Sequence, residues 1–258
     1  MKLLASDFDN TLWFGNHMKK KDIWAIQRFQ KHGNLFGLCT GRTLEGVLRP
    51  SQPYRLTYDF YILLSGGLIL DKNFEVIFES KIPLTIVKEI YKLLNDQDMS
   101  VVCQNQVYAL YKNSHYMQAN EIQSLDELHV EEVNAFSFHF HKNEIEKATA
   151  ATQKILEKYG DDVAAFQNNQ HIDLAAKGCS KGAGIKIIQE HFHLEEDCIY
   201  GIGDSWNDIP MLKSVGHGYT FAYAPKDVQS LAEKVVGSLA EGIRDIENKK
   251  RFVFFQKR

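Results

Sequence analysis

The chain has 258 residues, of which 44% are hydrophobic and 24% charged, and its formal net charge is −3. These proportions are ordinary for a soluble globular protein, and the length suffices for one large domain or two modest ones. The slightly acidic balance argues against a nucleic-acid binder, and no apolar run approaches the roughly 20 residues that span a bilayer.

Strand and helix signals alternate over the first 80 residues. Apolar runs predict strands at 3–8, 34–39 and 60–64, with helices at about 19–32 and from residue 43 between them. This rhythm predicts a parallel, doubly wound sheet with right-handed crossovers. Asp71, Lys72 and Asn73 then separate two short apolar runs and predict a hairpin turn.

The pattern changes after residue 83. A helix at about 84–95 precedes strands at 100–103 and 106–111, which a turn at Asn105 joins. A strand at 135–140, a helix to about residue 159, and strands at 163–167 and 170–174 follow. Asn143, with Glu146 three residues on, predicts the start of that helix as a variant of the capping box. The repeated order of helix, strand and strand is typical of an α+β unit with an antiparallel sheet.

The first rhythm returns at residue 180. It predicts a helix there, a strand to residue 202, a helix from 205, a strand near 217–222 and helices after 225. We therefore predict an α/β core split in sequence, residues 1–80 and 180–258, with an inserted α+β domain at 81–179. The basic residues at 249–251 and 257–258 are expected to be a solvated end, and the aromatic run 252–255 to pack against the core or a second subunit.

Cysteine usage indicates the compartment. The four cysteines, at positions 39, 103, 179 and 198, are scattered and form no CxxC pair. This spacing is typical of reduced thiols rather than of a disulfide scaffold or a zinc site. The apolar start of the chain is cut too short by Asp7 and Asp9 for a signal peptide. We therefore expect a cytoplasmic protein, and the sequence leaves open whether it is a monomer or a homodimer.

Two acidic clusters each follow an apolar run that has the character of a buried strand. Asp7 and Asp9 follow the first run, and Asp204 and Asp208 follow the run that ends at residue 202. In open α/β sheets, ligands bind at the carboxyl ends of the strands, so neighbouring strands would gather these carboxylates in one crevice. Like charges that close need a cation, and oxygen ligands suit Mg²⁺. The sequence therefore predicts a magnesium site.

Asp7 and Asp9 also have the spacing of a catalytic pair. Residues two apart on an extended chain point to the same side. One carboxylate can then attack an electrophile while the other transfers protons. Alone, such a pair is more typical of a cap on the next element, and only its companion motifs favour catalysis.

Two short motifs also end apolar strands. Thr40 offers a hydroxyl and Gly41 allows close approach of an anion to the backbone, with Arg42 next to them. Ser65 and Gly66 end the next strand, where backbone N–H groups can meet phosphate oxygens. Either motif alone is more typical of a simple turn.

Lys181 lies in the first turn of the helix that begins after residue 180. A lysine is locally unfavourable there, because the helix dipole favours anions at that end, so its presence indicates a negatively charged partner. The surrounding residues do not match the P-loop pattern, and no nucleoside triphosphate site is indicated.

In order and spacing, these motifs resemble those of the haloacid dehalogenase-like (HAD) superfamily over essentially the whole chain. The similarity is greatest to its Cof-type sugar-phosphatase subgroup, in which an α+β (C2-type) cap is inserted between the second and third motifs. The resemblance implies a Rossmann-like, mainly parallel core sheet, with Asp7 as nucleophile and Asp9 as general acid/base. It also implies that Thr40 and Lys181 bind phosphate.

The resemblance further implies how Mg²⁺ is held. The ligands would be the carboxylate of Asp7, the backbone carbonyl of Asp9 and Asp204, with Asn207 and Asp208 completing or orienting the shell. One departure is that the family usually has Asn-Gly where this chain has Ser65 and Gly66. The predicted substrate- and phosphate-binding residues are Thr40, Gly41, Arg42, Ser65, Gly66, Lys181 and Asn207, and the predicted metal-site residues are Asp7, Asp9, Asp204 and Asp208.

The resemblance implies a Mg²⁺-dependent phosphatase that hydrolyses small phosphorylated metabolites, chiefly sugar phosphates, through an aspartyl-phosphate. The aspartate two residues after the nucleophile favours phosphatase or mutase chemistry, because dehalogenases of the superfamily lack it. A phosphomutase and a non-catalytic phospholigand sensor are the alternatives, and the intact pair Asp7 and Asp9 argues against the sensor. The partners expected are small phosphorylated metabolites, with no nucleic acid and no membrane.

Four polar residues of the inserted domain are harder to interpret. His139 and His141 alternate on one predicted strand, and His171 and Asp173 alternate on a later one. Contact with the substrate's leaving group is one interpretation of each pair. The sequence favours a surface or packing role over that contact.

Overall fold

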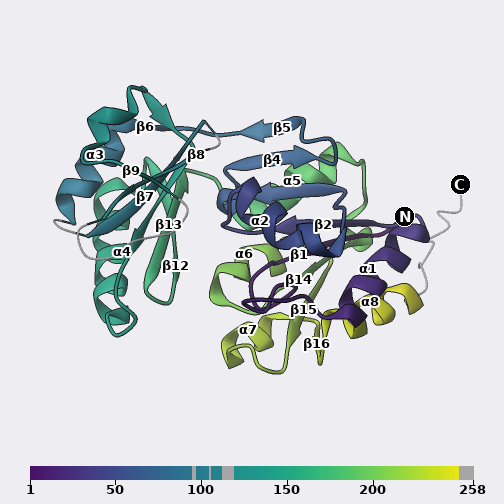
Figure 1. Ribbon diagram of the computed structural model, residues 1–258. Coiled ribbons are helices and arrows are strands. Elements are labelled where there is room, and N and C mark those ends of the chain that lie inside the picture. The colour runs from purple at the N-terminus through teal and green to yellow at the C-terminus, as the bar shows by residue number, and fades with distance from the viewer. Residues whose placement is uncertain (95–96, 105, 112–118, 250–258) are drawn as a thin grey trace, which may run out of the picture.

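The computed structural model describes residues 1–94, 97–104, 106–111 and 119–249 and arranges them in two lobes, each built on its own sheet (Figure 1). The predicted turn at Asn105, the basic residues 250–251 and 257–258 and the aromatic run 252–255 lie outside the described residues. Within the described ranges, no helix combines the length and the apolar character needed to cross a membrane.

The larger lobe is built on an eight-stranded sheet. Its strands are β1 (Leu3–Ser6), β2 (Leu35–Cys39), β3 (Phe60–Leu63), β4 (Leu68–Asp71), β5 (Val76–Glu79), β14 (Ile199–Ile202), β15 (His217–Phe221) and β16 (Lys234–Val236). Their order is β16-β15-β14-β1-β2-β3-β4-β5, and β1 to β3 and β14 to β16 run parallel. The predicted hairpin is confirmed as β4 and β5, which add antiparallel strands at one edge. β1 therefore lies between strands from opposite ends of the chain.

Helices cover both faces of this sheet. They are α1 (Lys20–Lys31), α2 (Leu44–Ser51), α5 (Lys181–His191), α6 (Ile209–Leu212), α7 (Lys226–Leu231) and α8 (Leu239–Asn248). Because side chains alternate along a strand, Leu4 of β1 packs with Ile26 of α1 and Ile243 of α8. Its neighbour Leu3 packs on the other face, with Ile185 of α5. The predicted doubly wound sheet is confirmed.

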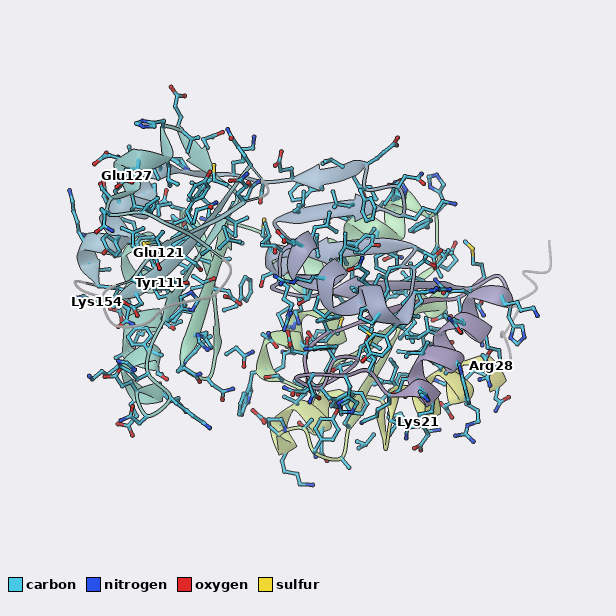
Figure 2. All side chains as sticks on the ribbon, in the orientation of Figure 1. Lys21, Arg28, Tyr111, Glu121, Glu127 and Lys154 are labelled. Carbon is cyan, nitrogen blue, oxygen red and sulfur yellow. The ribbon has the colours of Figure 1, made fainter. Side chains whose placement is uncertain are left out.

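Helix α1 shows how the sequence specifies this packing. Ile23, Ile26 and Phe29 recur at three-residue spacing and are buried. Lys21 and Arg28 project from the opposite side of the helix, away from the sheet (Figure 2). An apolar stripe of this kind places one helix face on a core and leaves the other in solvent.

The second lobe, here called the cap, comprises helices α3 (Leu84–Leu93) and α4 (Ile145–Tyr159) and two antiparallel-type sheets. Its strands are β6 (Ile82–Pro83), β7 (Asp98–Cys103), β8 (Gln106–Leu110), β9 (Asn120–Glu121), β10 (Glu132–Val133), β11 (Ala135–His139), β12 (Val163–Asn168) and β13 (His171–Ala176). Six of them form a sheet in the order β12-β13-β11-β7-β8-β9, antiparallel except between β8 and β9, and β10 pairs with β6. The predicted domain boundaries at 80/81 and 179/180 stay predictions.

Alternation also divides the cap sheet into two faces. Phe136 and Phe138 of β11 are buried with Val87 of α3 and Ile155 of α4. The residues between them therefore lie on the face without helices. That face borders the cavity described below.

The fold differs from the sequence-based expectations at several short elements. The strands β6, β9, β10 and β16 were not predicted, since each has only two or three residues and depends on its pairing partner. α4 begins without the expected Asn143 capping box, because its N-cap is Glu144, whose side chain caps nothing and instead accepts a hydrogen bond from the His141 N–H. The helix expected from Ser205 is a 3₁₀ turn followed by the short α6. The 3₁₀ turns are Gln52–Tyr54, Leu64–Gly66, Leu125–Leu128, Glu196–Cys198 and Trp206–Asp208.

Candidate active site

The carboxyl ends of β1 and β14 bring two acidic clusters together. Ser6 lies opposite Ile202, and the Asp7 N–H donates to the Ile202 carbonyl at 2.9 Å, which continues the parallel ladder by one residue. Carboxylate oxygens of Asp7, Asp204 and Asp208 lie within 4.8 Å of one another. The structure therefore gathers three of the predicted carboxylates at one edge of the core sheet.

Asp9 is held apart from these three by Arg42. The Arg42 guanidinium donates to both carboxylate oxygens of Asp9, through Nε and Nη2, at 2.8 Å each. Its Nη1 donates to the Gly46 carbonyl at 2.7 Å, which fixes the guanidinium in place. The Asp9 side chain is thus engaged, which agrees with a metal contact through its backbone carbonyl, as the resemblance implies.

Lys181 lies beneath the acidic cluster and is 2% exposed. The Ser180 side chain caps α5 by accepting from the Ala183 N–H, so the helix begins at Lys181 and directs it toward the strand ends. Its Nζ donates to Asp7 Oδ1 at 2.6 Å and to Asp208 Oδ1 at 2.5 Å. Burial by itself lowers the pKa of the lysine, but these two carboxylates outweigh it and raise the pKa above its usual value.

The negative charges of the three carboxylates are only partly balanced by Lys181. Burial raises the pKa of Asp7 well above its usual value, and the repulsion from Asp208 raises it further. The same two causes raise the pKa of Asp204 to about 7. One lysine therefore does not neutralise three carboxylates in this crevice. An oxygen-only, electron-rich site of this kind fits a hard divalent cation such as Mg²⁺.

Asp208 has a different surrounding from its two companions. Its Oδ1 accepts from Lys181, and its Oδ2 accepts from the N–H groups of Asp204 and Ser205 at 2.9 and 3.0 Å. Gly203 permits this arrangement, since a Cβ there would lie 2.4 Å from Asp208 Cγ. Because protein donors occupy both oxygens, the geometry fits a residue that orients the loop and Lys181.

A cavity of about 410 Å³ opens above the cluster, between the core and the cap. This volume lies in the range of about 300–1,000 Å³ that is typical of small-ligand pockets. The sequence-predicted residues that border it are Asp7, Asp9, Thr40, Gly41, Arg42, Asp204 and Asn207. Thr40 is held there by its N–H, which donates to the Ile62 carbonyl at 2.8 Å. Lys181 and Asp208 reach this cavity through their contacts with Asp7 and Asp204.

Ser65 and Gly66 are not among the residues that line this cavity. The Ser65 N–H donates to the Thr40 carbonyl at 3.1 Å, so it supports the loop that carries Thr40. Ser65 has φ +54°, a region in which asparagine is enriched, and this explains physically why asparagine is usual at this position of the motif. Gly66 has φ +96°, and a Cβ there would lie 2.3 Å from the Ser180 carbonyl oxygen. Their role in phosphate binding stays a prediction.

Replacing Gly66 by alanine is expected to lower the free energy of unfolding by about 3 kcal/mol, through left-handed backbone strain and the clash with Ser180. Gly178→Ala is the matched control, because Gly178 has φ +84° with nothing within 4 Å of the added Cβ. Strain alone should cost the control about 1–2 kcal/mol. Urea unfolding of both variants measures the difference, and equal losses would contradict the proposed packing.

The open face of the cap sheet supplies residues that sequence reasoning did not favour. His139, His171 and Asp173 line the cavity, whereas His141 follows β11 and is exposed. Contact of these cap residues with a leaving group stays a prediction. Ser137 lies opposite Asp173 and donates to its Oδ1 at 2.7 Å. His139 lies opposite His171, and their Nδ1 atoms are 3.1 Å apart.

The sequence indicates this cavity-lining face of the cap sheet by an alternation of polar and apolar residues along two strands. Ser137 and His139 alternate with the buried Phe136 and Phe138, and His171 and Asp173 alternate with Ile172 and Leu174 in the same way. The alternation shows that the polar residues share a face. Only the packing of α3 and α4 on the apolar face shows that the polar one faces the core.

Comparison with known proteins identifies the family of this chain. The family model for haloacid dehalogenase-like hydrolases matches residues 4–245. The chain belongs to this family. Two similar relatives are Phosphatase YwpJ of Bacillus subtilis, 24% identical over 91% of this chain and 94% of that protein, and 5-amino-6-(5-phospho-D-ribitylamino)uracil phosphatase YbjI of Escherichia coli, 23% identical over 96% of each.

Solved structures of HAD-family proteins show the same fold. The HAD subclass IIB sugar phosphatase BT4131 covers 96% of this chain with 98% of its own, at 21% identity and a TM-score of 0.80. A haloacid dehalogenase-like hydrolase from B. subtilis covers 97% of this chain with 100% of its own, at 18% identity and a TM-score of 0.85. The predicted family, fold class and enzyme class, a phosphatase of the HAD superfamily, are confirmed.

Proposed function

We propose that this HAD-family protein is a Mg²⁺-dependent phosphatase of small phosphorylated metabolites, chiefly sugar phosphates, that works through an aspartyl-phosphate on Asp7. The observation that carries the proposal is the buried contact of Lys181 with Asp7 and Asp208 at the floor of the cavity. A cation at that place sits beside a carboxylate that the sequence motifs identify as the nucleophile. The names of the relatives support the substrate class, since one of them is a sugar phosphatase.

Charge is the first obstacle that the site has to overcome. A phosphomonoester carries about two negative charges near neutral pH, so the Asp7 carboxylate meets repulsion as it approaches. Lys181 offsets part of this repulsion from below the cluster. Asp7, Asp204 and the Asp9 carbonyl would hold Mg²⁺, which when bound neutralises charge on the phosphoryl oxygens. Thr40 borders the same space with a hydroxyl that can donate to a phosphoryl oxygen.

Covalent catalysis then divides the reaction into two steps. Asp7 attacks phosphorus in line, the bond to the leaving oxygen breaks, and the phosphoryl group is carried by the Asp7 carboxylate. Asp9 donates a proton to the departing oxygen and later removes one from the water that hydrolyses the intermediate. Arg42 positions the Asp9 carboxylate at the cavity wall, and one of its two hydrogen bonds has to be released when Asp9 carries the proton.

The state of the cysteines supports the cytoplasmic setting that we propose. None of the four cysteines forms a disulfide, and all four are buried. Reduced thiols of this kind support a cytoplasmic setting. Small phosphorylated metabolites occur in that setting, and they are the partners that we propose for this cavity.

The deciding experiment measures phosphate release from a panel of sugar phosphates, nucleotides and pyridoxal phosphate, with Mg²⁺ and with EDTA. Selective turnover is expected with Mg²⁺, and metal removal should slow it at least about 100-fold, because the cation supplies several kcal/mol of charge stabilisation. Restoring Mg²⁺ should restore the rate, which controls for damage by the chelator. Equal rates in EDTA would contradict the metal. No release from any compound would favour the sensor, and isomerisation activated by a sugar bisphosphate would favour the mutase.

A further inference from the structure

The charge of the cap wall limits which leaving groups the cavity can hold. The described cap residues that line the cavity are His139, Asn168, Asn169, His171 and Asp173. This part of the wall contains one carboxylate and, within the described residues, no lysine or arginine. A second phosphate or a carboxylate on the substrate would therefore meet a negative group there and no cation.

The other basic groups around the cavity do not supply that cation. Burial lowers the pKa of His139 to about 4, and burial also lowers the pKa of His171, so both rings are neutral near pH 7. Arg42 already donates to Asp9 and to the Gly46 carbonyl. Lys181 lies below the cavity, where it contacts Asp7 and Asp208.

Asp173 occupies the point where the cap wall reaches the core. Ser137 donates to its Oδ1, while its Oδ2 lies so close to the core loop that a Cβ on Gly41 would be 2.8 Å from it. The described residues form no ion pair with this carboxylate, and burial raises its pKa, so a second negative charge beside it would meet repulsion or force the carboxylate to take up a proton. Oδ2 is therefore left to accept from a hydroxyl of a ligand.

A second cavity of about 350 Å³ lies beyond this point. It shares Gly41, Arg42, His139 and Asp173 with the first cavity. Asp173 therefore borders both spaces into which a leaving group can extend.

The rest of the entrance suits a neutral polyol. Trp206 and Tyr223 line the first cavity and are 47% and 53% exposed. Hydrogen bonds from Trp206 Nε1 to Asp227 and from the Tyr223 hydroxyl to the Asn10 carbonyl, at 2.6 and 2.5 Å, hold the two side chains in place. Aromatic faces pack against the C–H faces of a sugar, and amides such as Asn168 and Asn169 exchange hydrogen bonds with hydroxyl groups.

We propose that Asp173 is a specificity-determining residue that selects phosphomonoesters of neutral, hydroxyl-rich leaving groups and rejects substrates with a second phosphate or a carboxylate. Placing a like charge beside a half-buried carboxylate that has no cationic partner among the described residues is a repulsive element of the kind that gives specificity. The inference rests on the proposed phosphatase function. It also separates the phosphatase from a phosphomutase, which must hold a sugar bisphosphate.

The test compares kcat/KM for matched pairs with Mg²⁺, such as fructose 6-phosphate with fructose 1,6-bisphosphate and glycerol 3-phosphate with 3-phosphoglycerate. The wild type should prefer the member of each pair that has no anionic group besides the phosphate to be released. Asp173→Asn should reduce that preference about tenfold or more, since the amide keeps the hydrogen bonds and removes the charge. Asp161→Asn is the matched control, because it removes a carboxylate from an exposed turn of the cap, where it pairs with Lys177. The control should keep the wild-type preference.

A binding measurement separates this inference from the proposed function. Calorimetry of the same pairs on Asp7→Asn and on the double variant Asp7→Asn/Asp173→Asn requires no turnover. Relative to ligands with a neutral leaving group, the double variant should bind those with a second anionic group about tenfold more tightly. Unchanged ratios in both measurements, or an equal loss for every substrate, would overturn the role of Asp173. Absence of wild-type turnover together with a shifted binding ratio would instead overturn the phosphatase and leave Asp173 as the selector.

Discussion

Replacing Asp7 by asparagine is expected to reduce phosphate release by about 10⁴-fold or more, because an amide oxygen does not form the aspartyl-phosphate. The fold should survive the change. Burial and Asp208 raise the pKa of Asp7, so removing its charge relieves repulsion among the buried carboxylates. In EDTA the free energy of unfolding should therefore equal or exceed that of the wild type. Phosphate release under saturating Mg²⁺, together with urea unfolding, measures both effects.

Asp9→Asn is the matched comparison for that experiment. It removes a carboxylate two residues away that is held by Arg42 and is proposed to move protons. Loss of a general acid/base typically costs about 10²–10⁴-fold, so the Asp9 variant should retain more activity on substrates with good leaving groups. Release by Asp7→Asn at the wild-type rate would refute the nucleophile.

Lys181→Met should give the largest loss of stability in the core. The variant leaves the buried carboxylates of Asp7 and Asp208 without their cation, and breaking such a buried pair costs about 3–5 kcal/mol. Activity should fall with it. Without the lysine, the pKa values of these carboxylates are higher in the folded protein than in the unfolded chain. The folded state therefore binds more protons. The deficit should therefore grow as the pH rises from about 5 to 8. Urea unfolding in EDTA across this range gives the measurement.

The double variant Lys181→Met/Asp208→Asn tests the electrostatic cause. It removes one of the two carboxylates that Lys181 contacts, so much of the lost stability should return while activity stays low. Added Mg²⁺ should stabilise the single variant more than the wild type, because the cation then replaces a missing charge. A Lys181→Met variant as stable as the wild type would show that the contacts of Lys181 do not contribute to the free energy of unfolding.

The core strands were predictable because buried parallel strands leave a strong local signal. The strands before Asp7 and before Gly203 are buried throughout and largely apolar, since both faces of the sheet are covered by helices. β16 has no such signal. It has three residues, two of them exposed, and becomes a strand by pairing with β15. Asn143 failed as a capping residue for a similar reason, because its local preference was weaker than the contacts made by Glu144.

The sequence predicts the positions of some site residues, whereas the positions of others depend on the packing of distant segments. Thr40 and Gly41 directly follow β2, Asn207 lies in the 3₁₀ turn after β14, and all three line the cavity as expected. Ser65 and Gly66 also follow a strand, yet they lie behind the Thr40 loop. Sequence spacing does not distinguish a loop that faces a ligand from one that supports its neighbour, because this depends on which backbone packs against it.

The sequence by itself determined the types of chemical group in this protein: carboxylates after two apolar strands, a lysine at a helix start, and polar residues alternating on two cap strands. These follow from covalent spacing and from the periods of strands and helices. The tertiary structure decided which of them meet. The parallel pairing of β1 with β14 places Asp7 beside Asp204, and α5 directs Lys181 beneath them. Helices on one face of the cap sheet turn Asp173 toward the core, because a pattern of alternation defines two faces but not which of them is covered.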